Sequence, residues 1–373
     1  MTQEGKEVDA KLADEILNQT EDLFKKAKEY SFEIQRDETN KENNRSVAEY
    51  VYDKFCENLR ANNDMSNDMI RMSEGFLIWR CRLENLLAST STLLDLSIKN
   101  FCAYQELNGS QAVETKYGYK SILNKIIDSQ REKFEKRLCL KHMFKKVLIC
   151  DSKSKNCAHC QYTSEPNLAV VLLNDPSNKE LIVLCENIVL TISLGCLKAN
   201  LNTIIEPNSL VSDKKRTSIE RVGYGTVNKI FLFYDKKFWP NDVNILRPIW
   251  LTNGESFLEK MKKPSELDWA QSICEIDIKE TKENESYCLL FWLHGCEFYD
   301  KFTDEKIIND LTCLLSAILN KNDIPEPTKI LKCIFIKVNL YKFIKIYFVL
   351  ELHGTLILYL EDLIHTFQLD HII

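Results

Sequence analysis

Glycine is scarce in this sequence: 10 of the 373 residues are glycine, whereas about 7% is usual in proteins. Loops that bind dinucleotide phosphates need closely spaced glycines, because only glycine lets the backbone approach the phosphates closely. One G-x-G occurs, at Gly223 and Gly225, but Asn228 stands where the third glycine of the fingerprint would be. The strand-like sequence KIFLFY follows it. We therefore expect these glycines to permit a tight turn or close backbone packing, and not to bind phosphate.

The sequence also lacks a basic arm, and its first 16 residues contain no apolar segment. The formal net charge is −6 and the pI is near 5.7, which argues against nucleic acid as a partner. Without an apolar leader we expect neither a secretory signal nor an N-terminal membrane anchor. The 14 cysteines therefore indicate reduced thiols in a cytosolic or nuclear protein rather than a disulfide framework. The sequence does not indicate an oligomeric state.

The C-terminal segment is dense in aromatic and β-branched residues from Cys333 onward. Its most apolar window, residues 346–360, is 15 residues long and contains Glu351 and His353, whereas a spanning helix needs about 20 apolar residues. We therefore expect no stable membrane span. Association of this segment with a membrane surface is an alternative, which its aromatic density favours and its Lys and Glu residues oppose.

Hydrophobic periodicity predicts helices in the first 90 residues and a later change to strands. The helices are expected at residues 8–35, 46–62 and 64–87, with another after Thr303. Short runs rich in Val, Ile and Leu predict strands, several of them buried on both faces, at residues 146–150, 168–173, 181–185, 188–194, 229–234 and 287–293. This succession predicts an α/β fold with α+β character.

One compact cysteine and histidine cluster occurs, the string CAHC formed by Cys157, His159 and Cys160, with Cys150 and His142 upstream. Zinc sites usually combine two separated pairs of ligands. Three ligands within four residues do not easily surround a tetrahedral ion. We therefore interpret these residues as loop thiols and expect no metal site.

Lys229 opens an apolar strand and is the most informative charged residue in this part of the chain. Its amine could extend to solvent along the strand edge. Alternatively it could be desolvated, which would lower its pKa and suit it to proton chemistry. Composition does not decide between the two. No Ser/His/Asp arrangement is supported, because the six histidines are scattered.

Residues 186–250 carry a specific order of motifs. ENIVLTISLGCLKANL is followed by Glu206-Pro207 and then by SIERVGYGTVNKIFLFYDKKFWP. This order resembles the flavin-containing amine oxidases, especially the spermine and polyamine oxidases, with the lysine-specific histone demethylases more distant. The resemblance extends over residues 10–331, and it is strong within 186–250.

The resemblance implies a substrate domain with a mixed sheet and helices, together with an incomplete Rossmann-like FAD domain. Residues 1–110 would form the helical part of the substrate domain and residues 201–331 its sheet. Residues 111–200 would form part of the FAD domain, and residues 332–373 a divergent apolar tail. FAD is the implied cofactor and a polyamine the implied substrate, which is oxidatively deaminated with release of hydrogen peroxide.

The resemblance also implies roles for three residues. Lys229 matches the family lysine that holds a water beside flavin N5. Val147 matches a strand position whose backbone meets the adenine, and Thr191 matches a position close to the cofactor. The sequence departs from the family pattern in two places, because neither the G-x-G-x-x-G motif nor the C-terminal G-E motif is found.

These departures predict that the chain made alone retains no FAD and does not oxidise spermine. They also predict strands without their parallel neighbours and poor solubility. An alternative function is that of a non-catalytic relative, or a gene-model fragment, that acts at most as an interaction protein.

Overall fold

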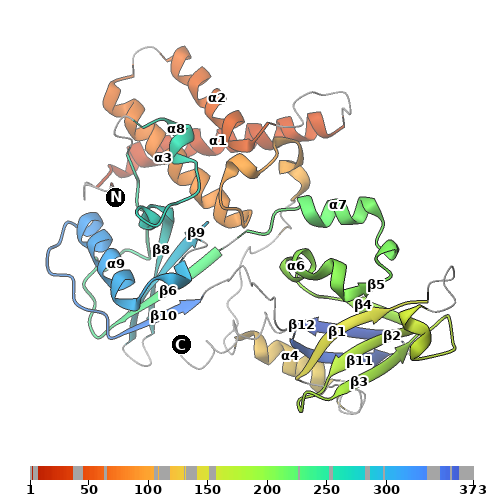
Figure 1. The fold of residues 1–373 in the computed structure, drawn as a ribbon. Helices are drawn as coiled ribbons and strands as arrows, with labels where there is room; N and C mark the ends of the chain where they lie inside the picture. Colours follow the sequence, from red (N-terminus) through yellow and green to blue (C-terminus); the bar gives the residue numbers. More distant parts are fainter. Residues whose placement is uncertain are drawn as a thin grey trace. The chain divides into compact units, whose positions relative to one another are not determined.

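The structure is a computed structural model that describes residue 2 and residues 7–36, 45–62, 65–104, 108, 118–129, 131, 141–150, 157–225, 227–251, 255–281, 286–296, 299–333, 345–352 and 355–360. The chain divides into two compact units, each built from two separate segments (Figure 1). Unit 1 comprises residues 1–109 and 223–337, and unit 2 comprises residues 110–222 and 338–373. Both contain helices and a sheet, so the predicted fold class of mixed helices and strands is confirmed.

The N-terminal part of unit 1 is helical, as predicted. Its helices are α1 (Ala10–Gln35), α2 (Val47–Ala61) and α3 (Asn67–Leu87). The side chains of Asp9 and Ser66 accept hydrogen bonds at the starts of α1 and α3, and Ser46 and Glu49 form a capping box at the start of α2. Such caps satisfy backbone amides that have no partner within the helix, which is why these polar residues mark the helix starts.

A five-stranded sheet in the order β10-β6-β9-β8-β7 completes unit 1. The strands are β6 (Val227–Tyr234), β7 (Ile245–Leu246), β8 (Ile273–Thr281), β9 (Ser286–His294) and β10 (Lys329–Cys333), accompanied by α8 (Phe257–Lys260) and α9 (Asp304–Leu319). These strands pair antiparallel in every described register. The parallel pairs expected of a mixed sheet occur in unit 2 instead. The helix predicted after Thr303 is confirmed as α9, and the Thr303 side chain caps it by accepting a hydrogen bond from the amide of Lys306.

Unit 2 contains a seven-stranded sheet in the order β3-β2-β1-β11-β12-β4, with β5 also paired to β1. Its strands are β1 (His142–Leu148), β2 (Ala169–Asn174), β3 (Glu180–Cys185), β4 (Asn187–Leu190), β5 (Ile205–Glu206), β11 (Lys345–Leu352) and β12 (Thr355–Leu360). Its helices are α4 (Gly118–Asp128), α6 (Leu194–Ile204) and α7 (Asp213–Arg221).

Two strand predictions in unit 2 require correction. The strand expected to reach Leu194 ends at Leu190, because Ser193 caps α6 and its hydroxyl accepts a hydrogen bond from the amide of Cys196. Of the strands expected to be buried on both faces, β2 is buried throughout, whereas β3 is largely exposed. An exposed apolar strand gives the same sequence pattern as a buried one, so the pattern alone does not separate them.

The C-terminal segment provides neighbours for strands that were expected to lack them. β11 pairs antiparallel with β1, and β12 pairs parallel with β4. Residues 201–222, which the resemblance assigned to the substrate domain, pack with unit 2 through α6 and α7. No helix among the described residues is both long and apolar enough to cross a membrane.

Gly225 lies against the backbone that follows α3. A Cβ atom at this position would come within 1.5 Å of the carbonyl oxygen of Ser89, whereas one at Gly223 would meet no atom of the described residues within 4 Å. Backbone atoms cannot move aside as a side chain can. The expectation of close backbone packing is therefore confirmed for Gly225, and this contact joins the approach to β6 to the end of α3.

We expect Gly225→Ala to lower the free energy of unfolding by about 3 kcal/mol, because the added methyl group overlaps a backbone carbonyl. Gly223→Ala is the matched control, and its effect should stay within about 0.5 kcal/mol. Urea denaturation of the two variants measures both values. Equal stability of the two variants would show that the backbones do not approach this closely.

Candidate functional site

The candidate site is built on a row of side chains that crosses the sheet of unit 1. Alternation along β6 sends Ile230 and Leu232 into the core shared with α9, and turns Lys229 to the opposite face. Lys229 pairs with Trp292 of β9, and Trp292 pairs with Glu275 of β8. The three residues therefore lie side by side on one face of three neighbouring strands.

Lys229 is half-buried, and its Nζ atom lies 4.2 Å from the centroid of the Trp292 ring. An ammonium group over an indole ring is stabilised by a cation–π interaction of about 0.5–2 kcal/mol. The indole Nε1 donates a hydrogen bond of 3.2 Å to a carboxylate oxygen of Asp277. Trp292 is thus held in place by a neighbour on β8, and it in turn supports the lysine amine.

A cavity of about 670 Å³ opens beside this row. Apolar residues from the end of α3 form one wall, and Gly223, Gly225, Lys229, Trp292 and Glu275 form much of the rest; the apolar residues are Leu83, Leu86, Leu87 and Ala88. Lys229 is the third residue of its strand and lines this cavity. The apolar strand that Lys229 was predicted to open is largely buried.

Glu275 supplies the carboxylate of the cavity wall. Its side chain is 19% exposed and accepts a hydrogen bond of 2.8 Å from Nε of Arg247. Trp79 of α3 donates from its indole to the carbonyl of Cys274, at 2.9 Å. That bond ties α3 to β8 next to Glu275 and so fixes the apolar wall against the acidic one. Sequence reasoning missed Glu275, because one glutamate within a strand carries no motif.

A second cavity in unit 1, of about 550 Å³, contains buried polar groups that sequence reasoning also missed. Arg82, Asn85 and His294 line it. Burial, with a contribution from Arg82, lowers the pKa of His294 to about 3, so the imidazole is neutral near pH 7. Burial likewise lowers the pKa of Arg82 to about 10. These residues fall within helix and strand patterns that give no functional signal.

The two residues expected near the cofactor lie in unit 2. Val147 is 2% exposed in β1, between Val171 of β2 and Ile205 of β5. Thr191 follows β4 and is exposed. Because Val147 has a paired strand on each side, its position offers no free strand edge to an adenine. The contact with adenine stays a prediction that no observation in the structure supports.

The described residues do not fit the pyrophosphate of FAD. Such a group is held by glycine-lined amides between a parallel strand and the start of a helix. In the described part of unit 2, the turn from β4 into α6 is followed by one glycine, Gly195, and the first turn of α6 is capped by Ser193. The sequence-based expectation of a missing phosphate loop is therefore consistent with this part of the chain.

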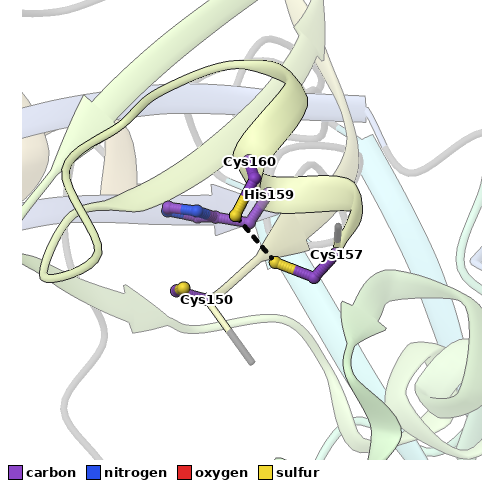
Figure 2. A group of neighbouring side chains, drawn as sticks. All are labelled: Cys150, Cys157, His159 and Cys160. Atoms are coloured by element: carbon purple, nitrogen blue, oxygen red, sulfur yellow. Dashed lines mark hydrogen bonds between the residues drawn. The ribbon is translucent and has the colours of Figure 1, made fainter. Parts of the chain in front are cut away.

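The cysteine cluster contains a fourth candidate ligand in addition to the three that the string CAHC provides. Cys150, Cys157, His159 and Cys160 place their candidate ligand atoms within 4.8 Å of one another (Figure 2). Hydrogen bonding to Cys157 and the neighbouring thiols raise the pKa of the Cys160 thiol to about 11. The reason given above for expecting no metal, a set of three crowded ligands, therefore does not hold, because Cys150 makes a fourth.

Comparison with known proteins places the chain in a family. Residues 16–335 match the model of the flavin containing amine oxidoreductases. The peroxisomal N(1)-acetyl-spermine/spermidine oxidase of Bos taurus is 27% identical over 148 residues, which are 39% of this chain and 28% of that protein. The probable polyamine oxidase 5 of Arabidopsis thaliana is 29% identical over 152 residues, which are 39% of this chain and 26% of that protein. Each alignment thus spans little more than a quarter of the relative.

A solved structure of an engineered double mutant of putrescine oxidase is also similar, with a TM-score of 0.48 and 10% identity. It covers 89% of this chain and 63% of the putrescine oxidase chain. A likeness at this level does not identify a function. The family match extends over most of the sequence, however, and the motifs around Lys229 lie within it. The chain therefore belongs to the family of flavin-containing amine oxidoreductases, and FAD is the cofactor that this membership implies.

Proposed function

We propose that the cavity beside Lys229 binds a polyamine, and that oxidative deamination of this polyamine is the reaction for which the site is built. The observation that carries the proposal is the row Lys229–Trp292–Glu275 along a cavity that is also lined by apolar residues from the end of α3. A polyamine alternates methylene chains with amino groups, so it needs apolar and anionic surfaces side by side.

The charges of the row suggest how a polyamine would lie. The carboxylate of Glu275 and the ring of Trp292 both attract an ammonium group. A cation such as Lys229 has the opposite effect, because it favours the neutral form of a nearby amine. An amine must be neutral to be oxidised at its adjacent carbon. We therefore assign the reacting nitrogen to the Lys229 end of the row and a charged nitrogen to the Glu275 end.

The spacing of the row supports this orientation. Lys229 and Glu275 are separated by one intervening strand, so their Cα atoms are about 10 Å apart. That distance suits two nitrogens of one extended polyamine that are separated by two methylene segments and the nitrogen between them. In this arrangement Lys229 can also donate a hydrogen bond to a water next to the reacting carbon, which is the role that the resemblance implies.

The described residues do not form a site for the pyrophosphate of FAD, so amine binding and catalysis are considered separately for this chain. We propose that the 373-residue chain binds polyamine but retains no FAD. The alternative function is that of a non-catalytic relative that acts as an interaction protein. The missing phosphate loop favours this alternative, whereas the intact charged row supports amine binding.

We expect spermine to bind the purified chain, and Glu275→Gln to weaken binding about tenfold, or about 1.4 kcal/mol, because the neutral amide no longer attracts an ammonium group. Isothermal titration calorimetry measures the affinity of each protein. Glu266→Gln is the matched control, since Glu266 is exposed and does not line the cavity; its affinity should equal that of the parent chain.

Glu275→Gln also removes the negative charge that pairs with Arg247. The thermal midpoint of each variant must therefore be recorded at the same time, to separate loss of binding from loss of folding. Equal spermine affinity in the two folded variants would contradict the proposed site.

We further expect the desalted chain to show no flavin absorbance and no spermine-dependent peroxide, because the phosphates of FAD have no glycine-lined loop to hold them. Absorbance spectroscopy after incubation with excess FAD, followed by a peroxidase-coupled assay, provides the measurement. A yellow and active preparation would contradict this expectation, and Lys229→Met should then lower the turnover by about 100-fold or more.

A further inference from the structure

The cysteine cluster of unit 2 has the composition and the spacing of a metal site. Its three sulfur atoms and one imidazole lie within 4.8 Å of one another, and Figure 2 shows the side chains of Cys150, Cys157, His159 and Cys160 converging on a small volume. In a tetrahedral zinc site with Zn–S distances of about 2.3 Å, neighbouring ligand atoms are about 3.8 Å apart. The largest separation among the candidate ligand atoms exceeds this value by about 1 Å.

His159 is oriented for metal binding by a hydrogen bond from its other nitrogen. Its Nε2 atom lies 2.6 Å from the carbonyl oxygen of Leu168. Since a carbonyl only accepts, Nε2 carries the proton, and the lone pair of the neutral ring is on Nδ1. The ring is 2% exposed, and Nδ1 has no hydrogen-bond partner among the residues that the structure describes. A buried nitrogen without a partner costs free energy, and a metal ion would satisfy it. A backbone carbonyl bonded to the second ring nitrogen is the usual partner of a metal-bound histidine.

The sulfur atoms complete a soft ligand set. The Sγ atoms of Cys157 and Cys160 lie 3.3 Å apart, close to the separation of two thiolates on one zinc ion. Cys150 lies two residues beyond the end of β1. Three thiolates and one imidazole favour zinc over magnesium or calcium, which prefer oxygen ligands.

The position of the cluster gives an ion a structural role. Residues 149–168 connect β1 to β2, and a connection of 20 residues is long for two paired strands. Cys150 lies near its start, and Leu168, which binds the histidine, lies at its end. Between them, Ala158 and Tyr162 pack on Leu148, Val170 and Leu172. An ion held by both ends of the loop and by its short helix (Ala158–Gln161) would reduce the loop's conformational freedom.

We propose that Cys150, Cys157, His159 and Cys160 form a structural zinc site that closes the β1–β2 connection. Four protein ligands fill the tetrahedral coordination of the ion, so no position is left for water or substrate. The site therefore stabilises unit 2 and takes no part in amine chemistry. It stands independently of the function proposed for the cavity beside Lys229.

Elemental analysis of the full 373-residue chain, purified without added metal and dialysed, tests the proposal. We expect about one zinc per chain in the parent protein, and loss of most of this zinc in Cys157→Ser. Cys313→Ser is the matched control, because Cys313 is an exposed cysteine on α9 in unit 1. This control should retain the zinc of the parent.

A measurement on the parent chain alone covers the case in which Cys157→Ser fails to fold. A mercurial that blocks thiols should release the zinc, which a chromogenic chelator then detects, and cobalt should replace it with strong thiolate-to-cobalt charge-transfer bands. Zinc no higher in the parent than in Cys157→Ser would overturn the proposal. A disulfide between Cys157 and Cys160 in freshly purified, metal-free protein, detected by peptide mapping, would overturn it as well.

Discussion

The alternation of side chains along β6 is the constraint on which the candidate amine site depends. Ile230 and Leu232 are fully buried against α9, and any shift of register by one residue would expose them. Their burial therefore fixes Lys229 on the opposite face, beside Trp292. The lysine is thus positioned by the core of unit 1 rather than by the loop that precedes it.

Two further strands and one helix supply the other side chains of the candidate site. β9 brings Trp292 and β8 brings Glu275, while the end of α3 supplies the apolar wall. The contact between Gly225 and the backbone of Ser89 holds the entry to β6 against the end of α3. A charged wall and an apolar wall are therefore joined by a backbone contact that only glycine permits.

The elements that local patterns specify could be predicted from the sequence. The capped helices and the buried strands β2, β6 and β9 were of this kind, because periodicity and capping residues act over a few neighbours. The row of Lys229, Trp292 and Glu275 was not predictable in the same way, since it depends on the register of strands that are distant in sequence. The inclusion of Cys150 in the cluster was also not predictable, because spacing along the chain does not show that the residue after a strand end lies beside the loop that carries the other ligands.

A crystal structure of the chain soaked with spermine tests most directly whether the cavity beside Lys229 receives a polyamine. We expect one amino group within hydrogen-bonding distance of the Glu275 carboxylate, with the methylene chain along Trp292 and a second nitrogen near Lys229. Spermine bound at another site, with this cavity empty, would contradict the proposed binding site.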